Sequence, residues 1–466
     1  MDSFVGKHVL VLGLGLHGGA IGNIKWLASQ NAQITVSDTK SQEQLEPSIQ
    51  KLSDISGIKY IFGSQDEINL DDVDMVLRNP AVPRKAPLLE QAREKNIPVM
   101  MDSSIFFNQV GRQRIIGITG SKGKTTTSHA IFHTLKNFIT ETTAVGIDGV
   151  SPLGELETIS SKTSPIVFEI SSWRLEALQE THISPHIAVC TSIYKDHLNT
   201  YSSYEEYIEV KKQIIKDQTH DDIAILNYDD EIIRTWEKDV KGQLYWYSLK
   251  PLPEHGLGIW VDGGDVKTNW NNQEQTICTA LDIPHSSPHE LRNKLPAILI
   301  ALLHSAMPQQ ITSALKAIPQ LKHRMQLVRE IGGVKYINDT TATMPDATIA
   351  ALKSIQENPL ILILGGSDKA LEFQNLAQQI SQQKNLKHLI WLPGTATDRM
   401  KQEILPVTPA HSYYASSMEE VVSSASEFAK EGDTVLLSPG ATSFGLFLHE
   451  FDRGDAFIEA VEKLKK

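Results

Sequence analysis

The sequence is poor in cysteine, with only Cys190 and Cys278 and no CxxC pair. This excludes a disulfide framework and a cysteine-rich zinc site. Long hydrophobic runs are also missing, since no apolar stretch approaches the ~20 residues that a bilayer-spanning helix needs. The N-terminal segment lacks the charged start, apolar stretch and cleavage site of a signal peptide. We therefore expect a cytoplasmic protein without membrane insertion.

Positive charge is scarce as well: 44 Lys and Arg residues face 56 Asp and Glu residues, which gives a net charge of -12. Nucleic-acid binding relies on basic surface, so nucleic acid is not an expected partner. The chain has no fixed-period repeat and no low-complexity segment. Its 466 residues, 41% of them hydrophobic, suffice for about three domains with proper cores.

Short apolar runs alternate with segments of helical period, which is typical of α/β domains with parallel sheets. We expect linkers near residues 110–114 and 319–322, and so three α/β domains in series: 1–111, 112–320 and 321–466. A hairpin is expected around the turn Asp262-Gly263-Gly264. The predicted strands are 8–12, 34–37, 115–118, 166–170, 187–190, 223–226, 334–337, 360–364, 389–392 and 435–437.

The first glycine-rich loop, Gly-Leu-Gly-Leu-His-Gly at 13–18, fits GxGxxG between a predicted strand and a predicted helix at 20–28. Such a loop allows a diphosphate to lie at the helix N-terminus. Asp38 ends the next predicted strand, where a carboxylate can accept hydrogen bonds from ribose hydroxyls. The motif indicates diphosphate geometry and not the identity of a cofactor, so NAD, another ligand and a purely structural turn all stay open.

The second glycine-rich loop, Thr-Gly-Ser-Lys-Gly-Lys-Thr-Thr-Thr at 119–127, follows a predicted strand and precedes a predicted helix that ends near residue 136. Position 118 is Ile, so the loop fits TGxxGKTT and not the general P-loop pattern. Its backbone N–H groups would cradle phosphates, Lys124 would reach the β and γ phosphates, and Thr125 would ligate Mg²⁺. The loop therefore predicts ATP binding.

Two further strands end in polar residues at the same predicted sheet edge, where ligands of parallel sheets bind. Glu169 closes the strand at 166–170, and Asp196-His197 follows the strand at 187–190. Each could be an ordinary residue facing water. Beside a phosphate loop, Glu169 is a candidate Mg²⁺ ligand and His197 a candidate for a metal or phosphate role.

Five motifs together, in this order, resemble the Mur ligase family over nearly the whole chain: TGxxGKTT, Glu-Ile-Ser-Ser-Trp at 169–173, Asp196-His197, His323-Arg324 and Asn338-Asp339. The sequence is most similar to the members that add D-glutamate to UDP-N-acetylmuramoyl-L-alanine. The Asp-Asn-Pro-Arg signature of the diaminopimelate- or lysine-adding members is absent, as is the histidine-rich stretch of the alanine-adding ones.

The resemblance implies an ATP-dependent amide ligase of peptidoglycan precursor synthesis, acting as a monomer through an acyl phosphate and a tetrahedral intermediate. It implies a Rossmann-like uridine-nucleotide domain, a central P-loop domain and a Rossmann-like C-terminal domain. Other readings stay open: a Mur-type ligase for L-glutamate or another amino acid, a folate-type polyglutamate ligase, a non-catalytic sugar-nucleotide sensor, and an NAD-dependent oxidoreductase. The polyglutamate ligase is disfavoured because it would not need the N-terminal GxGxxG domain.

The resemblance also implies roles for individual residues. Catalytic roles fall on Lys124, Glu169, His197 and Lys211. The ATP-binding set is Gly120, Ser121, Lys122, Gly123, Lys124, Thr125, Thr126, His289, Asn293, Arg324 and Asp339. The sugar-nucleotide set is Gly13, Gly15, Leu16, His17, Gly18, Asp38, Thr39, Asn79 and Ser171, and the glutamate set is Thr343, Lys369 and Ser443.

Two Mg²⁺ ions would be held by Thr125, Glu169, His197 and a carbamate that CO₂ forms on Lys211. A carbamate turns a cation into an anionic oxygen ligand, which suits hard Mg²⁺. Lys211 completes the family's Tyr-x-x-x-Lys pattern with Tyr207, but the adjacent Lys212 stays open. Simpler roles stay open for others: helix N-terminal polarity for His289 and Asn293, a surface salt bridge for Arg324, and a helix cap or solvent exposure for Lys369.

Four positions depart from the family pattern. Thr341 stands in place of a lysine, Glu290 in place of an asparagine, Ala81 in place of a glycine, and Asp148 where an amide usually meets the sugar nucleotide. Asp148 either ligates Mg²⁺ or is misaligned. These departures leave ATP use unaffected and bear on the identity and stereochemistry of the added amino acid.

Overall fold

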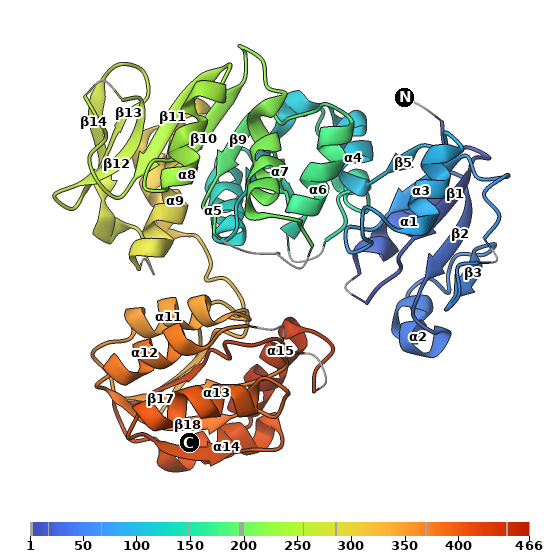
Figure 1. The fold of residues 1–466 in the computed structure, drawn as a ribbon. Helices are drawn as coiled ribbons and strands as arrows, with labels where there is room; N and C mark the ends of the chain where they lie inside the picture. Colours follow the sequence, from blue (N-terminus) through green and yellow to red (C-terminus); the bar gives the residue numbers. More distant parts are fainter. Residues whose placement is uncertain are drawn as a thin grey trace. The chain divides into compact units, whose positions relative to one another are not determined.

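The computed structural model describes residues 3–16, 18–66, 68–147, 150–194, 200–254, 256–284, 287–368, 371–443 and 446–465. The chain divides into two compact units, Met1–Ile318 and Pro319–Lys466. The first unit contains a five-stranded and a nine-stranded sheet, and the second contains a six-stranded sheet (Figure 1). The expected three-domain α/β fold is confirmed, whereas the domain boundaries at residues 111 and 320 stay predictions.

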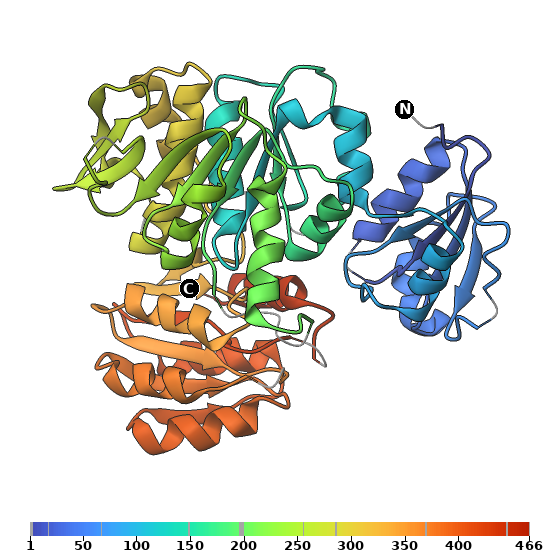
Figure 2. The ribbon, with the colours of Figure 1, turned by 45° about the horizontal axis from the view of Figure 1, so that its top comes forward.

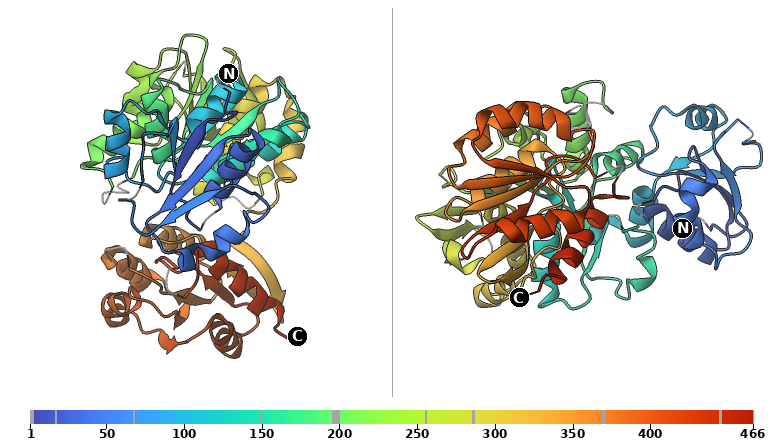
Figure 3. Two further views of the ribbon diagram at one scale, coloured as in Figure 1. Left: turned by 90° about the vertical axis from the view of Figure 1, so that its right-hand side faces the viewer. Right: turned by 90° about the horizontal axis from the view of Figure 1, so that it is seen from below.

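The first sheet is fully parallel, in the order β3-β2-β1-β4-β5 (Figure 3). Its strands are β1 (His8–Leu12), β2 (Gln33–Asp38), β3 (Lys59–Phe62), β4 (Met75–Arg78) and β5 (Val99–Met100). The helices are α1 (Gly19–Ser29), α2 (Gln42–Gln50), α3 (Pro87–Glu94) and α4 (Asp102–Val110). Because β1 and β4 are adjacent, the loops after them lie at the same sheet edge.

The nine-stranded sheet has the order β14-β13-β12-β11-β10-β9-β6-β8-β7 and is parallel from β12 to β7, with an antiparallel extension through β13 and β14. The strands are β6 (Ile115–Thr119), β7 (Thr143–Val145), β8 (Ile166–Glu169), β9 (Ile187–Cys190), β10 (Ile223–Asn227), β11 (Gln243–Ser248), β12 (Gly258–Asp262), β13 (Asp265–Asn269) and β14 (Glu274–Thr279). The helices are α5 (Lys124–Lys136), α6 (Ser172–Glu180), α7 (Tyr204–Lys216), α8 (Glu231–Arg234), α9 (Pro288–Leu303) and α10 (Pro308–Lys316).

Alternating strand residues bury the two faces of this sheet under different helices. Ile116 and Val189 belong to the core beneath α5 and α9, while Ile115 and Cys190 belong to the core beneath α6 and α7. Both faces are therefore apolar, which explains why these strands read as continuous hydrophobic runs. Helix α7 is seen in front of the sheet in Figure 1.

The second unit has the strand order β15-β16-β20-β17-β18-β19, parallel except for the β15–β16 pair. The strands are β15 (Gln326–Ile331), β16 (Val334–Asn338), β17 (Leu360–Leu364), β18 (Leu386–Trp391), β19 (His411–Tyr414) and β20 (Thr434–Leu437). Helices α11 (Pro345–Ser354), α12 (Gln374–Gln382) and α13 (Thr397–Ile404) cover one face, and α14 (Met418–Phe428) and α15 (Glu450–Glu462) cover the other (Figure 2).

Every strand expected from the sequence is present, with ends that shift by at most a few residues, and the expected hairpin is β12–β13. Among the described helices, none combines the length and the apolar character that crossing a membrane requires.

Candidate active site

The phosphate loop connects β6 to α5 in the geometry that the sequence predicts. Gly123 is the N-cap of α5 with a left-handed φ of 90°. A Cβ at this position would lie 2.6 Å from Asn293 Oδ1 of α9. Only glycine fits here, because the backbone is left-handed and a neighbouring amide fills the space. The contact brings Asn293, predicted from a distant part of the sequence, directly against the loop.

Lys124, Thr125 and Glu169 meet at the carboxyl ends of β6 and β8. Thr125 Oγ1 donates to Glu169 Oε1 at 3.3 Å, and Lys124 Nζ donates to the carbonyls of Gly120 and Ser121 at 3.1 and 3.3 Å. Strands β6 and β8 are hydrogen-bonded neighbours, which places Glu169 beside the loop. A hydroxyl and a carboxylate side by side form the hard oxygen donor set that Mg²⁺ prefers.

Lys211 and Lys212, adjacent in α7, have different surroundings. Lys211 is 2% exposed, and its Nζ donates to the Gly120 carbonyl at 3.0 Å and to Thr119 Oγ1 at 3.3 Å. Lys212 instead forms an ion pair with Asp239 at 2.5 Å. The structure therefore brings Lys211, and not Lys212, to the base of the phosphate loop.

Several residues to which the sequence analysis gave no site role support this loop. The Tyr207 hydroxyl lies 2.9 Å from Ser121 Oγ, and Ser192 Oγ both accepts from Lys122 N and donates to Lys122 O. Thr191 Oγ1 donates to the Lys122 carbonyl at 2.6 Å. The sequence does carry a signal for Thr191 and Ser192, which is their position along the chain. They directly follow β9, and β9 pairs with β6, the strand that leads into the phosphate loop.

The departure at Glu290 has a local explanation. Glu290 occupies the third position of α9 and closes a capping box: its carboxylate accepts from Ser287 N and Oγ at 3.0 and 2.9 Å, and Glu290 N donates back to Ser287 Oγ. An acidic residue here also complements the helix dipole. His289 is exposed in the first turn of α9 and, four residues before Asn293, shares a helix face with it.

The first glycine loop is held by neighbouring side chains. A Cβ on Gly13, where φ is 91°, would lie 2.8 Å from Val82 Cγ2. Asn79 Nδ2 donates to the Gly13 carbonyl at 3.1 Å. Asp38, 6% exposed, accepts from the backbone N–H groups of Leu14 and Gly15 at 2.9 and 3.0 Å and of Lys40 at 3.0 Å. Asp38 thus holds the loop, and its contact with a nucleotide stays a prediction.

Other predicted sugar-nucleotide residues lie near this edge or at the start of α6. Gly18 is the N-cap of α1 with φ 86°, Leu16 is half-buried and Thr39 is exposed. Ser171 caps α6 through its hydroxyl, which accepts from Arg174 N. Ala81 N donates to Asn79 Oδ1 at 3.1 Å, so the chain turns there without the family's glycine.

In the second unit, Asp339 joins β16 to the loop after β20. Its Oδ2 accepts from Ser438 Oγ at 2.8 Å and its Oδ1 from Met325 N at 3.2 Å. His323 and Met325, which flank Arg324, have left-handed φ values of 67° and 44°. Such backbone is costly for residues other than glycine and concentrates at functional sites.

Two of the three predicted glutamate residues are described: Thr343 follows β16 and Ser443 follows β20. Ser443 is 3% exposed, and its hydroxyl has no hydrogen-bond partner among the described residues. Thr343 is half-buried. Thr341, in place of the family's lysine, donates its hydroxyl to the His323 carbonyl at 3.1 Å. The buried Arg453 links the two loops, donating to Thr340 O and Ala441 O. Burial lowers the pKa of Arg453 to about 10, so it stays charged at neutral pH.

Five residues named in the sequence analysis lie outside the described residues: His17, Asp148, Asp196, His197 and Lys369. Their predicted roles stay predictions.

Comparison with known proteins is decisive for the family. Three family models match in order: the Mur ligase MurD-like N-terminal domain at residues 7–101, the Mur ligase middle domain at 118–301, and the Mur ligase glutamate ligase domain at 323–440. A protein of Roseiflexus sp. (strain RS-1), named UDP-N-acetylmuramoylalanine--D-glutamate ligase, is 36% identical over 98% of both chains. The chain belongs to the Mur ligase family.

Relatives with the same name are found in other bacteria. The Koribacter versatilis protein is 34% identical over 98% of both chains, and the Thermoanaerobacter pseudethanolicus protein is 32% identical over 99% of both.

Solved Mur ligases share the fold at low identity. UDP-N-acetylmuramate-alanine ligase MurC of Thermotoga maritima aligns with a TM-score of 0.64 at 18% identity, covering 98% of this chain and 100% of that one. MurF of Acinetobacter baumannii aligns with a TM-score of 0.60 at 14% identity, covering 99% and 92%.

Proposed function

We propose that this Mur ligase adds D-glutamate to UDP-N-acetylmuramoyl-L-alanine in an ATP-dependent reaction of peptidoglycan precursor synthesis. The observation that carries the proposal is the phosphate loop with Lys124, Thr125, Glu169 and Lys211 gathered at one sheet edge. The shared name of the full-length relatives supplies the substrates.

The residues at this edge fit a nucleotide with Mg²⁺. The loop leaves no room for a Cβ at Gly123, and its N–H groups open the helix α5, a favourable place for phosphate. Thr125 and Glu169 provide a hydroxyl and a carboxylate oxygen within 3.3 Å of each other. Mg²⁺ at these oxygens would supply charge neutralisation for phosphoryl transfer.

In the proposed reaction, the substrate carboxylate attacks the γ-phosphorus of ATP and ADP leaves, giving an acyl phosphate. The glutamate amine then attacks the acyl carbon through a tetrahedral intermediate, and phosphate leaves. Phosphoryl transfer depends on positioning and on cationic charge where oxyanions develop, more than on a covalent nucleophile. Lys124 has the position to supply that charge, and it needs only to leave the Gly120 and Ser121 carbonyls.

The second unit would contribute Arg324 and Asp339 to ATP and Thr343, Lys369 and Ser443 to glutamate. The buried Ser443 hydroxyl is a donor with no partner among the described residues, which fits a carboxylate of the incoming amino acid.

We further propose that two Mg²⁺ ions take part, that Lys211 acts as a carbamate, and that the enzyme is a cytoplasmic monomer. Lys211 suits this role because it is buried beside the loop, whereas Lys212 is engaged by Asp239. Light scattering at several concentrations tests the monomer, and a concentration-dependent mass would contradict it.

Thr341 and Ala81 depart from the family pattern, so one alternative is a ligase that adds L-glutamate. Phosphate release from ATP with UDP-N-acetylmuramoyl-L-alanine separates the two when D-glutamate, L-glutamate and no amino acid are compared. We expect release with D-glutamate and a product whose mass increases by one glutamyl residue. Release with L-glutamate alone would refute the stereochemistry, and release with neither would refute the proposed function.

A further inference from the structure

A buried ion pair joins the first sheet of the first unit to helix α6. Arg78, the last residue of β4, donates from Nη2 to Glu176 Oε2 at 3.1 Å, and the two side chains are only 4% and 5% exposed. The residues are 98 positions apart in the chain. The pair therefore exists only because the fold brings β4 and α6 together.

Arg78 also holds the turn that follows β4. Its Nε donates to the Val82 carbonyl at 2.8 Å. The side chain of Val82 lies against Gly13, and Asn79 donates to the Gly13 carbonyl. One guanidinium thus fixes the turn of residues 79–82 against the first glycine loop.

The other oxygen of Glu176 holds a second segment. Oε1 accepts from the Tyr201 hydroxyl at 2.8 Å, and Tyr201 lies four positions after His197 in the chain. Burial raises the pKa of Tyr201, so the phenol stays protonated and donates. The Tyr201 ring packs at 5.4 Å from Tyr207, which bonds to Ser121 of the phosphate loop.

We propose that Glu176 is a positioning residue, which ties the turn 79–82 of the sugar-nucleotide site to the segment 200–207, whose Tyr207 contacts the phosphate loop. A buried ion pair adds little stability over a well-packed apolar pair, so its directional bonds are what distinguish it. Each oxygen of Glu176 serves one of the two segments, so one carboxylate sets their relative position. This inference rests on the proposed function.

Three conservative variants each change a different part of the network formed by Arg78, Glu176 and Tyr201. Glu176→Gln removes the charge and is expected to raise the KM for UDP-N-acetylmuramoyl-L-alanine about tenfold and to lower kcat about tenfold. Arg78→Lys keeps the charge but loses the planar fork that reaches both Val82 and Glu176, so mainly KM rises. Tyr201→Phe leaves the ion pair intact and removes one hydroxyl, so mainly kcat falls.

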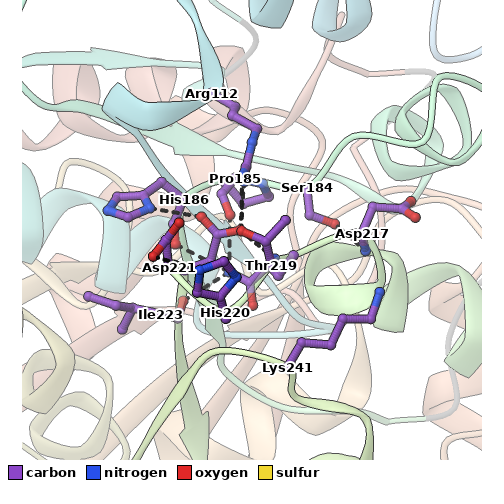
Figure 4. A network of polar contacts seen from close by, with 12 residues as sticks. Arg112, Ser184, Pro185, His186, Asp217, Thr219, His220, Asp221, Ile223 and Lys241 are labelled. Atoms are coloured by element: carbon purple, nitrogen blue, oxygen red, sulfur yellow. Dashed lines mark hydrogen bonds and ion pairs between the residues drawn. The ribbon is translucent and has the colours of Figure 1, made fainter.

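The matched control is Asp222→Asn. Asp222 is fully buried and accepts from Arg112 Nη1 at 2.7 Å and from His186 Nδ1 at 2.8 Å. Figure 4 shows Arg112, His186 and Thr219 pointing into this network. Asp222 precedes β10 and so lies at the amino edge of the sheet, whereas the phosphate loop follows β6 at the carboxyl edge, ~16 Å away along the strand direction at ~3.3 Å per residue. We expect a lower unfolding midpoint but KM and kcat within twofold of wild type.

Two outcomes would overturn the inference while the proposed function stands: Glu176→Gln with KM and kcat within twofold of wild type, or Asp222→Asn with the same kinetic losses as Glu176→Gln. If the wild-type enzyme shows no D-glutamate-dependent turnover, the proposed function fails instead. Amide hydrogen exchange tests the link between the two segments without relying on turnover. If Glu176 holds both segments, Glu176→Gln must speed exchange in residues 79–86 and in residues 200–207. Unchanged exchange in either segment would refute it.

Discussion

Replacement of Lys211 tests the proposed catalytic chemistry most directly. The side chain is buried at the base of the phosphate loop, with its nitrogen 3.0 Å from the Gly120 carbonyl and 5.5 Å from the centre of the Tyr207 ring. Lys211→Met keeps most of the side-chain volume and removes the nitrogen that a carbamate requires. Loss of one positioned charged group at such a site lowers kcat by a factor of about 10²–10³, which corresponds to about 3–4 kcal/mol of lost transition-state stabilisation.

The cost to folding is smaller. The variant removes two bonds that the charged Lys211 donates, to the Gly120 carbonyl and to Thr119 Oγ1, and so destabilises the fold by about 1–3 kcal/mol, although the Gly120 carbonyl keeps Lys124 as a donor. Lys212→Ala is the matched control on the same helix, because it removes only a partly exposed ion pair worth about 0–1 kcal/mol. Urea unfolding of all three proteins separates loss of stability from loss of catalysis.

The assay is phosphate release under saturating substrates, with and without short carboxylic acids. A further variant, Lys211→Ala, leaves a cavity where the lysine side chain was. We expect it to regain part of its activity with added acid, because the carboxylate replaces the missing anionic carbamate in that cavity. A ¹³C NMR signal from a carbamate, after equilibration with ¹³C-labelled bicarbonate, should be present in wild type and Lys212→Ala and absent in Lys211→Met. Full activity of Lys211→Met, or a carbamate signal that persists in it, would refute the reasoning.

Three further predictions follow from the first unit. Lys124→Ala should reduce ATP-dependent turnover at least about 10³-fold at a nearly unchanged unfolding midpoint; near-wild-type turnover would contradict the phosphate-loop assignment. Gly123→Ala places a Cβ 2.6 Å from Asn293 Oδ1 on a left-handed backbone, so it should destabilise the fold by about 1–2 kcal/mol and weaken ATP binding, which calorimetry measures. Burial, then the charges of His133 and Lys294, lower the pKa of His129 to about 4. The neutral ring stabilises the fold above pH 6.5, and this contribution is lost as the pH falls towards 4. The wild type should lose about 1–2 kcal/mol more than His129→Gln over that range, after allowance for solvent at the partly exposed ring; parallel stability curves would show that His129 is not the group.

The amino-acid sequence identified both glycine loops, because their function depends on local backbone. Residues 119–127 carry glycine, lysine and threonine at fixed offsets between an apolar strand and a helix, and neighbours in the chain decide that geometry. The family signature likewise resides in short motifs. Even the choice between Lys211 and Lys212 has a local signal: Tyr207, Val210, Lys211 and Ile214 repeat at helical spacing and are all buried.

Other features depend on contacts between distant residues. Asp38 follows a strand as a ribose-binding carboxylate should, yet it bonds to loop amides more than twenty positions earlier in the chain. Glu290 looked like a departure that bears on the site, and the structure shows a capping residue. Arg78 was not singled out, because nothing nearby in the chain indicates that Glu176 neutralises it.

The sequence by itself determined the α/β class, the order of the strands along the chain, the phosphate loop and the family, because hydrophobic period and glycine placement act over a few residues. Only the tertiary structure decided which side chains share a carboxylate and which polar groups are buried. Those outcomes depend on how strands and helices far apart in the chain pack together, and the burial that packing produces sets the strength of each charge and hydrogen bond.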